Sequence, residues 1–440
     1  MSSVQTFKIS PGGKLSGETR VASDKSISHR SIIFGSLAEG ITRVEGFLEA
    51  EDTLATLQAF RSLGVKIDQY GNGRVDIHGV GLHGLKPASQ PLDLGNSGTS
   101  MRLLCGLLAA QKFDSILTGD ASLSQRPMQR VTRPLAEMGA SIETTSAGTA
   151  PLKITGHSQL HGIDYPMQIA SAQVKSCLLL AGLYANGTTS ITEPAPTRDH
   201  TERMLEGFGY LLQRQGSQIS IRGQQGVLSP VSIDVPGDIS SAAFFLVGAA
   251  ISPGSDVLLK HVGINPTRTG IIDILGLMGA DIQLLNQQQI GGELVADIHL
   301  CNTPLTGIEI PESLVPLAID EFPAVFIAAA CAQGETILSG AAELRVKESD
   351  RIQVMADGLK ILGIDAEPTP DGIRIIGGQL TGGDIDSHGD HRIAMAFAIA
   401  GLRASSAIEI QRCENVQTSF PDFADIARHL GLNIQTIGGS

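Results

Sequence analysis

The chain has 440 residues, 42% hydrophobic and 18% charged, which predicts a protein of two folded domains and excludes a disordered chain. A net charge of −13, the absence of Trp and an aromatic share of 4% argue against a nucleic-acid partner. No apolar run reaches the ~18 residues of a membrane span, and the N-terminus lacks the apolar core of a signal peptide. Because the five cysteines are scattered and form no CxxC motif, we expect a reduced, cytoplasmic protein without disulfides or structural zinc.

Six segments share one pattern, in which a polar start is followed by nearly uninterrupted small and apolar residues. In chain order they are DKSISHRSIIFGSLA, NSGTSMRLLCGLLAA, SAQVKSCLLLAGL, DISSAAFFLVGAA, DEFPAVFIAAACA and GDHRIAMAFAIAGL. A helix that is apolar on all sides must be buried on all sides. We therefore expect six helices in the interior of the fold.

A second motif follows each of these segments: an amphipathic helix, a glycine and an apolar strand. The six glycines are Gly64, Gly139, Gly209, Gly279, Gly363 and Gly431. Glycine is the expected residue just past a helix, because it enters the left-handed backbone region at little cost. The two motifs together define a strand–helix–strand–helix–strand repeat of about 70 residues. Six copies in register argue against two unrelated α/β domains.

The repeats predict the domain boundaries. Three repeats per domain is the natural grouping, and a Pro-Gly turn in VPGD separates the third repeat from the fourth. The first domain is then residues 23–236, and the second comprises residues 1–22 and 237–440. The residues before Ala22 form a strand with no repeat of its own, and we expect it to complete the sheets of the second domain. The expected fold is α/β, with buried helices at the centre and sheets outside.

The polar starts of the buried helices are candidate anion-binding sites, because helix N-termini carry unpaired N–H groups and partial positive charge. If the helices run parallel in each domain, their N-termini face one cleft between the domains. The first helix opens with Lys25, Ser26 and Arg30. A solvated first turn capped by Asp24 or Ser23 is the alternative. Because cations at a helix N-terminus oppose its dipole, we favour a bound anion.

The next candidates follow in chain order. Gly98, in LGNSGTSMR, allows a ligand to approach the backbone closely, although many helix starts look alike. Arg126 is held in an extended direction by the proline after it, but a surface arginine before a helix explains it equally well. Ser171 and Gln173 open the third buried helix, and Arg198 has the place in its repeat that Arg126 has in the second.

The segment ELRVKESDRI interleaves cations with carboxylates. Lys347 and Glu348 lie four and three residues before Arg351, which predicts that they share one helical face with it. A solvated, salt-bridged surface is the usual explanation of such a run. The segment nevertheless has the same place in its repeat as Arg126 and Arg198, and this recurrence favours a functional role.

Two more helix starts complete the set. In AIDEFP, either Asp320 or Glu321 caps an otherwise apolar helix, or one of them is a base held among cations. In GDHRIAM, Arg392 joins the cations at the helix starts, while a structural role is expected for His391.

The motifs DKSISHR, LGNSGTSMR, QRP, SAQVKS, RVKESDR and GDHRIAM, in this order and spacing, resemble the 3-phosphoshikimate 1-carboxyvinyltransferase (EPSP synthase) family over essentially the whole chain. The resemblance implies a two-domain inside-out α/β barrel of six βαβαββ-type repeats, three per domain. It implies transfer of the enolpyruvyl group of phosphoenolpyruvate to the 5-hydroxyl of shikimate 3-phosphate, on the route to chorismate and the aromatic amino acids. No metal or organic cofactor is expected, glyphosate is expected to compete with phosphoenolpyruvate, and a monomer is expected.

The resemblance also assigns roles to individual residues. It implies that shikimate 3-phosphate is bound by Lys25, Ser26, Arg30, Ser171, Gln173, Arg198, Asp320 and Lys347. It implies that phosphoenolpyruvate is bound by Lys25, Gly98, Arg126, Gln173, Arg351 and Arg392. Asp320 is expected to be the base on the 5-hydroxyl, and Glu348 or Lys25 to deliver the proton to the methylene carbon.

Three positions depart from the commonest family pattern. Ala172 replaces a serine, Glu343 replaces an asparagine, and Thr418 stands where some members have a lysine that binds phosphoenolpyruvate. These departures suggest the divergent second class of the family.

Three other functions compete with this one. The enolpyruvyl transferase acting on UDP-N-acetylglucosamine usually has Lys-Asn at the position of Lys25-Ser26 and a cysteine before the arginine, and residues 121–125 contain no cysteine. An RNA 3′-phosphate cyclase would need a nucleotide-binding loop that this sequence lacks. A non-catalytic sugar-phosphate binder would not need both Asp320 and Glu348.

Overall fold

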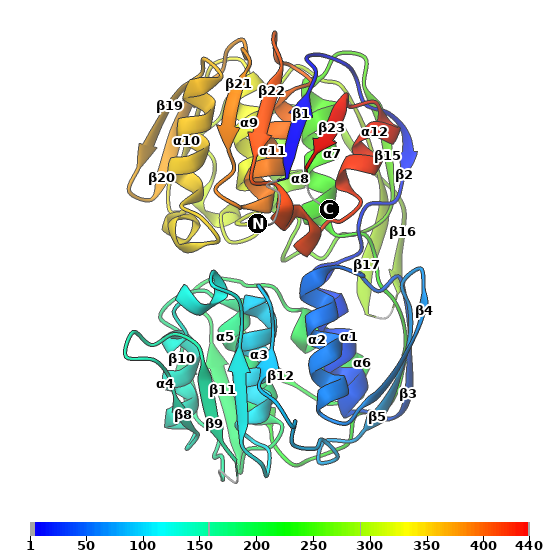
Figure 1. Cartoon of the computed structure of the whole chain (residues 1–440), viewed down its shortest axis with the longest axis vertical. Helices are drawn as coiled ribbons and strands as arrows, with labels where there is room; N and C mark the ends of the chain where they lie inside the picture. Colours follow the sequence, from blue (N-terminus) through cyan, green and yellow to red (C-terminus); the bar gives the residue numbers. More distant parts are fainter. Residues whose placement is uncertain (1–4, 157–158, 291, 439–440) are drawn as a thin grey trace. The chain divides into compact units, whose positions relative to one another are not determined.

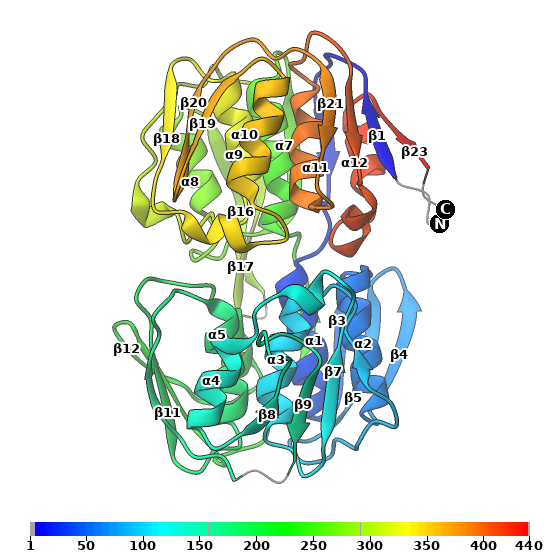
Figure 2. The same ribbon diagram turned by 60° about the vertical axis from the view of Figure 1, so that its left-hand side comes forward.

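The computed structural model describes residues 5–156, 159–290 and 292–438. The chain divides into two compact units, both drawn in Figures 1 and 2. Unit 1 comprises Met1–Ala22, Pro236–Gln289 and Leu294–Ser440, and unit 2 comprises Ser23–Val235 and Ile290–Glu293. Within the described residues, no helix combines the length and the apolar character that a bilayer crossing demands.

Unit 2 has three buried helices in its interior, which are α1 (Lys25–Leu37), α3 (Gly98–Leu108) and α5 (Ala172–Gly182). Its first sheet has the order β14 (Ser232–Asp234), β3 (Glu39–Glu45), β5 (Arg74–Val80), β4 (Lys66–Gly71). The second has the order β6 (Leu92–Asp93), β7 (Ser115–Thr118), β9 (Leu152–Thr155), β8 (Ser141–Glu143). The third has the order β10 (Asp164–Pro166), β11 (Thr188–Thr192), β13 (Gln218–Arg222), β12 (Gln213–Gln215).

Unit 1 repeats this plan around α7 (Ile239–Ile251), α9 (Phe322–Cys331) and α11 (His391–Ala400). Its first sheet has the order β16 (Ile282–Ile290), β17 (Glu293–Cys301), β15 (Asp256–Gly263), β2 (Ser16–Thr19). The second has the order β18 (Glu335–Leu338), β20 (Gly372–Ile376), β19 (Asp365–Thr369). The third has the order β21 (Gly383–Asp386), β22 (Ile408–Gln411), β1 (Thr6–Ile9), β23 (Ile434–Ile437).

Six amphipathic helices each lead into an edge strand of one sheet. They are α2 (Glu51–Ser62), α4 (Gln129–Glu137), α6 (His200–Gly207), α8 (Gly270–Leu277), α10 (Arg351–Ile361) and α12 (Phe423–Leu430). The six glycines predicted to end these helices all have positive φ, between 84° and 114°. Short 3-10 turns complete the chain at η1 (Leu123–Gln125), η2 (Glu312–Leu314), η3 (Ala342–Val346) and η4 (Glu414–Thr418).

The six sheets share one strand pattern, which confirms the predicted repeat. In five of them an outer strand pairs in parallel with the strand that follows a buried helix, as β6 does with β7 and β21 with β22. In the β18 sheet, a parallel bridge from Glu309 to Ile337 has the same place. The repeat therefore fixes the position of each buried helix against its own sheet.

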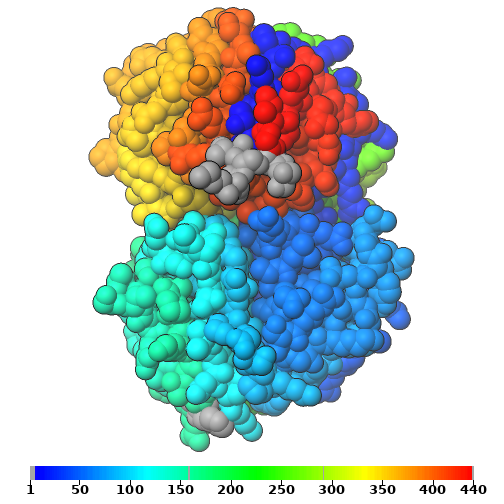
Figure 3. Space-filling view, viewed as in Figure 1, coloured from blue at the N-terminus to red at the C-terminus, as the bar shows by residue number. Residues whose placement is uncertain are grey.

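The N-terminal residues complete sheets of unit 1, as expected from the sequence. β1 lies antiparallel between β22 and β23, and β2 pairs in parallel with β15. The surface in Figure 3 shows the described part of the N-terminal segment, in blue, against the C-terminal segment, in red. The sequence predicted one strand before Ala22, whereas the structure has two strands, β1 and β2, in different sheets.

The interior of unit 1 is built from the apolar helices. All 13 residues of α7 are buried, and Phe244 and Phe245 on this helix contact Phe423 at the start of α12 with ring centroids 5.8–6.2 Å apart. Burial of each such ring contributes roughly 1.5–3 kcal/mol. A helix buried on every side holds its N-terminus in a fixed position, and the candidate site residues lie at these ends.

Candidate active site

In unit 2, the start of α1 carries the first predicted cation. The Asp24 side chain caps the helix and accepts a hydrogen bond from the backbone N–H of Ile27 at 2.8 Å, so the capping alternative holds for this residue. Lys25 Nζ lies 2.5 Å from Asp52 Oδ2, and 23% of the lysine side chain remains exposed. The lysine is therefore held beside the helix start and is still open to a ligand.

Arg30 is buried one turn further along α1. Its guanidinium donates to Thr201 Oγ1 at 2.7 Å, to Ser176 Oγ at 2.8 Å and to the backbone oxygen of Ser26 at 3.0 Å. Burial lowers the pKa of Arg30 to about 10, Glu202 and Asp24 oppose this effect, and Arg198 adds to it. An anion bound beside Arg30 and Arg198 would relieve the unfavourable burial of positive charge.

The starts of α3 and α5 are joined by hydrogen bonds. Gln173 Oε1 accepts from Arg102 Nη1 at 2.5 Å, and Gln173 Nε2 donates to Thr99 Oγ1 at 3.0 Å. A Cβ atom placed on Gly98 would lie 3.2 Å from Nη1 of both Arg102 and Arg126. The structure thus brings Gly98, Arg126 and Gln173 together, as predicted for one ligand.

Arg102 also belongs to this group. From the sequence it is one of the cations near the start of a buried helix, but it was not assigned to a substrate. It is 8% exposed and bonds the predicted Gln173. Arg126 is anchored from the other side, since its Nη2 donates to Asn96 Oδ1 at 2.6 Å. The position of Arg102 inside a buried helix was the available signal, because arginine is seldom fully buried without a partner.

Ser171 caps α5 and accepts from the backbone N–H of Val174 at 3.4 Å. A cavity of about 280 Å³ lies beside it, with Arg130, Arg133 and Tyr165 also in its lining. Ser171 therefore borders a space that can hold a small ligand.

In unit 1, Asp320 lies among cations at the start of α9. Its Oδ1 is 3.3 Å from Arg351 Nη1 and 3.4 Å from Lys347 Nζ, and its backbone oxygen accepts from Arg392 Nη1 at 3.0 Å. The carboxylate is 14% exposed. Four predicted residues therefore meet at one point of this unit.

The alternative in which the Glu321 side chain caps the helix is wrong. Glu321 has the N-cap position of α9, but its side chain makes no capping hydrogen bond. Glu321 is buried and accepts a hydrogen bond from Ser240 Oγ on α7. The alternative of a carboxylate held among cations remains for Asp320.

Arg351 is the centre of the charge cluster and is 1% exposed. Its guanidinium lies 2.8 Å from Asp390 Oδ2, 2.6 Å from Glu348 Oε2 and 3.3 Å from Asp320 Oδ1. Burial opposes the charge, but Asp390, Glu348 and Asp320 together raise the pKa of Arg351 above its ordinary value. The guanidinium is permanently charged and fixes the direction of all three carboxylates.

The prediction that Lys347 and Glu348 share a helical face with Arg351 is wrong. α10 begins at Arg351, because Asp350 caps it by accepting from the backbone N–H of Gln353 at 3.0 Å. Lys347 and Glu348 precede the helix, and both still contact the cluster. Because Asp350 caps the helix, the helical turn that the spacing suggested for Lys347 and Glu348 does not form.

Two remaining residues, His391 and Thr418, have mainly structural surroundings. His391 is 6% exposed at the first position of α11, next to the capping residue Asp390. Thr418 is 4% exposed and donates to the backbone oxygen of Asn415 at 2.7 Å. At this position the chain has a packed hydroxyl in place of the lysine of some family members.

Comparison with known proteins gives a consistent result. The model of the EPSP synthase (3-phosphoshikimate 1-carboxyvinyltransferase) family matches residues 9–426. A relative from Methylococcus capsulatus, named 3-phosphoshikimate 1-carboxyvinyltransferase, is 68% identical over 429 residues, 98% of each chain. A relative of the same name from Alkalilimnicola ehrlichii is 64% identical over 427 residues, 97% of this chain and 96% of its own.

Comparison with solved structures gives a result that agrees with the sequence comparison. EPSP synthase from Acinetobacter baumannii is 60% identical with a TM-score of 0.90, and the match covers 98% of this chain and 100% of the other. The enolpyruvyl transferase NikO from Streptomyces tendae, at 16% identity and a TM-score of 0.80 over 100% of both chains, shows the fold alone. The predicted fold class and the predicted family are both confirmed.

Proposed function

The chain belongs to the EPSP synthase (3-phosphoshikimate 1-carboxyvinyltransferase) family, and we propose that it transfers the carboxyvinyl group of phosphoenolpyruvate to the 5-hydroxyl of shikimate 3-phosphate. Phosphate is the second product, and the reaction lies on the shikimate pathway to chorismate and the aromatic amino acids. The observation that carries the proposal in this chain is the Asp320 carboxylate within 3.4 Å of the cationic groups of Lys347 and Arg351. This arrangement unites a candidate base with cations for an anionic substrate.

We assign shikimate 3-phosphate mainly to unit 2. The buried guanidinium of Arg30 and the neighbouring Arg198 offer charge to its phosphate, and Lys25 remains open at the helix start. Hydroxyl and amide groups at two helix starts would hold the phosphate and the ring. The full assigned set is Lys25, Ser26, Arg30, Ser171, Gln173, Arg198, Asp320 and Lys347.

We assign phosphoenolpyruvate to the group around Gly98 and to the cations of unit 1. The absence of a Cβ atom on Gly98 leaves room between the guanidinium groups of Arg126 and Arg102, and Arg102 bonds Gln173. Arg351 and Arg392 supply the matching charges next to Asp320. Arginines in fixed positions bind phosphate and carboxylate oxygens through paired hydrogen bonds. The full set is Lys25, Gly98, Arg126, Gln173, Arg351 and Arg392.

In the reaction that we propose, residues of the assigned sets and Glu348 supply and accept every proton. Glu348 or Lys25 gives a proton to the methylene carbon of phosphoenolpyruvate, which leaves positive character on the adjacent carbon. The 5-hydroxyl oxygen attacks that carbon and loses its proton to Asp320. The group that gave the first proton, Glu348 or Lys25, then takes a proton back from the new methyl group as the carbon–oxygen bond to phosphate breaks. The fixed cations stabilise the departing phosphate.

Phosphate release with two different acceptors tests the proposal. The chain is incubated with phosphoenolpyruvate and either shikimate 3-phosphate or UDP-N-acetylglucosamine. We expect release with shikimate 3-phosphate alone. Release with UDP-N-acetylglucosamine alone would reverse the assignment, and binding of shikimate 3-phosphate without any release would indicate a non-catalytic binder.

We further propose that glyphosate binds in the phosphoenolpyruvate half of the site and that the enzyme is a cytoplasmic monomer. One chain already carries both groups of site residues, which supports the monomer. The five cysteines, all within the described part of the chain, are free thiols, as expected in a reducing compartment. Sedimentation equilibrium across a range of concentrations tests the monomer, and a mass of twice the chain would overturn it.

A further inference from the structure

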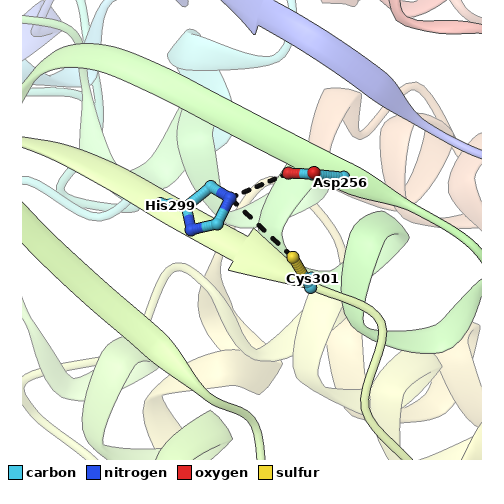
Figure 4. Close-up of side chains that lie close together, drawn as sticks. All are labelled: Asp256, His299 and Cys301. Atoms are coloured by element: carbon cyan, nitrogen blue, oxygen red, sulfur yellow. Dashed lines mark hydrogen bonds and ion pairs between the residues drawn. The ribbon is translucent and has the colours of Figure 1, made fainter.

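Three side chains of unit 1 meet at one end of the β15–β17 strand pair. Asp256 on β15 lies opposite Cys301 on β17 in the antiparallel register. His299 lies two residues before Cys301, so both side chains project from the same face of the sheet. Figure 4 shows the carboxylate of Asp256 and the sulfur of Cys301 both close to one ring nitrogen of His299.

The distances between the donor atoms suit a shared metal ion. His299 Nε2 is 2.8 Å from Asp256 Oδ1 and 3.8 Å from Cys301 Sγ. All three donor atoms lie within 4.8 Å of one another. Ligand atoms around a tetrahedral zinc ion are about 3.4–3.6 Å apart, given the usual bond lengths to nitrogen, oxygen and sulfur. Small side-chain rotations therefore convert the cluster into three corners of a tetrahedron.

An ordinary ion pair does not explain the arrangement fully. A histidine–carboxylate pair of the same length exists on another sheet, where His78 Nε2 is 2.8 Å from Asp68 Oδ2. That pair has no thiol in its group, whereas Cys301 Sγ approaches the same ring nitrogen that contacts Asp256. Convergence of sulfur, nitrogen and oxygen on one point is characteristic of a coordination site.

We propose that Asp256, His299 and Cys301 bind one divalent transition-metal ion of the zinc class. A thiolate with an imidazole selects zinc or cobalt over magnesium and calcium, which prefer oxygen ligands. Asp256 is 66% exposed and His299 28% exposed, so an ion can enter from solvent and water can take the fourth position. None of the three residues is assigned to a substrate, so the ion is structural and joins the ends of β15 and β17.

This proposal departs from the expectation of no structural zinc, which missed the site because Asp256 is more than forty residues from its partners. The short His-x-Cys spacing on β17 was visible, but two ligands on one strand do not make a metal motif. The third ligand, Asp256, lies on β15, which pairs with β17.

Titration of the chelator-treated, full-length chain with Zn²⁺ and Co²⁺ tests the proposal. We expect one ion per chain by calorimetry, a sulfur-to-cobalt charge-transfer absorption, and a rise in the melting temperature with Zn²⁺. Cys301→Ser should remove the absorption and weaken Zn²⁺ binding at least about tenfold. Asp256→Asn should also weaken binding.

Asp68→Asn is the matched control, since it alters the histidine–carboxylate pair that has no thiol. It should leave both affinity and absorption unchanged. Equal Zn²⁺ affinity in the native chain and in Cys301→Ser, or no charge-transfer absorption with Co²⁺, would mean an adventitious ion only and would overturn the proposal. Carboxyvinyl transfer is measured separately, so either proposal can fail without the other.

Discussion

At the scale of single residues, the site is defined by how charge is distributed around Asp320 and Arg351. Three carboxylates surround the buried Arg351, and one of them, Asp320, also faces Lys347. Asp390 lies on the side of Arg351 away from solvent, with no exposed surface on its side chain, and holds the guanidinium in place. Asp320 and Glu348 are both held by Arg351 and partly exposed, at 14% and 29%, and Asp320 is the one that also contacts Lys347.

Asp320→Asn should separate binding from chemistry. The amide keeps the size of the side chain but cannot accept a proton, so kcat should fall by about 10²–10⁴-fold. The affinities for shikimate 3-phosphate and phosphoenolpyruvate, measured by fluorescence or calorimetry, should change little. Asp365→Asn, at a carboxylate 56% exposed on β19, is the control and should retain full turnover. Loss of binding equal to the loss of turnover would make Asp320 a structural residue.

Gly98→Ala should discriminate between glyphosate and phosphoenolpyruvate. The added methyl group meets the ends of two arginine side chains at 3.2 Å, and these ends can shift by a few tenths of an ångström. We expect a modest rise in the KM for phosphoenolpyruvate and a rise of about tenfold or more in the Ki for glyphosate, which corresponds to ~1.4 kcal/mol. Equal factors for both ligands would contradict this steric explanation.

His29 should make stability depend on pH. Burial, with Lys25 and Arg30 nearby, lowers the pKa of His29 well below its ordinary value. The unfolded chain therefore takes up a proton below about pH 6.5 that the folded chain refuses, so stability falls as the pH falls through that range. His29→Gln should reduce this loss by up to ~1.4 kcal/mol per pH unit. Urea unfolding of both proteins at pH 7.5 and 5.5 measures it, and identical losses would contradict the argument.

At the scale of elements, the repeat could be predicted from the sequence because it depends on local chemistry. Small apolar residues mark the buried helices, and glycine marks the left-handed ends of the amphipathic helices. The partners of buried charges could not be predicted in the same way. Asp390 reaches Arg351 from 39 positions away, and Glu321 bonds Ser240 across 81. Such pairs depend on how helices pack, which no local pattern encodes.

Two glycine substitutions test the role of the helix ends. Gly431 has φ 114°, and a Cβ atom there would lie 2.5 Å from the backbone oxygen of Lys14. Gly431→Ala should therefore lower the free energy of unfolding by more than about 1 kcal/mol. Gly276, inside α8, has open space at its Cβ position, and Gly276→Ala should raise stability by roughly 0.5–1 kcal/mol. Urea unfolding measures both, and a stable Gly431→Ala would show that the strain argument is wrong.

At the scale of the whole molecule, the proposal divides one reaction between two units of the same design. Unit 2 offers cations at the starts of α1 and α3 and the polar side chains of Ser171 and Gln173 at the start of α5, and unit 1 offers the charge cluster of Asp320 and Arg351. Each unit alone has groups for binding, but the candidate base and the candidate proton donor Glu348 lie in unit 1. Family membership explains why the two groups occur together in one chain.

The central claim is that these side chains transfer the carboxyvinyl group without a bound metal or organic cofactor. The most direct measurement is product formation by the chelator-treated chain from shikimate 3-phosphate and phosphoenolpyruvate, followed by NMR. We predict equal amounts of phosphate and of a shikimate 3-phosphate ether carrying the carboxyvinyl group on the 5-oxygen, at a rate unchanged by added Zn²⁺. Absence of that ether, or its formation only after a metal is restored, would contradict the claim.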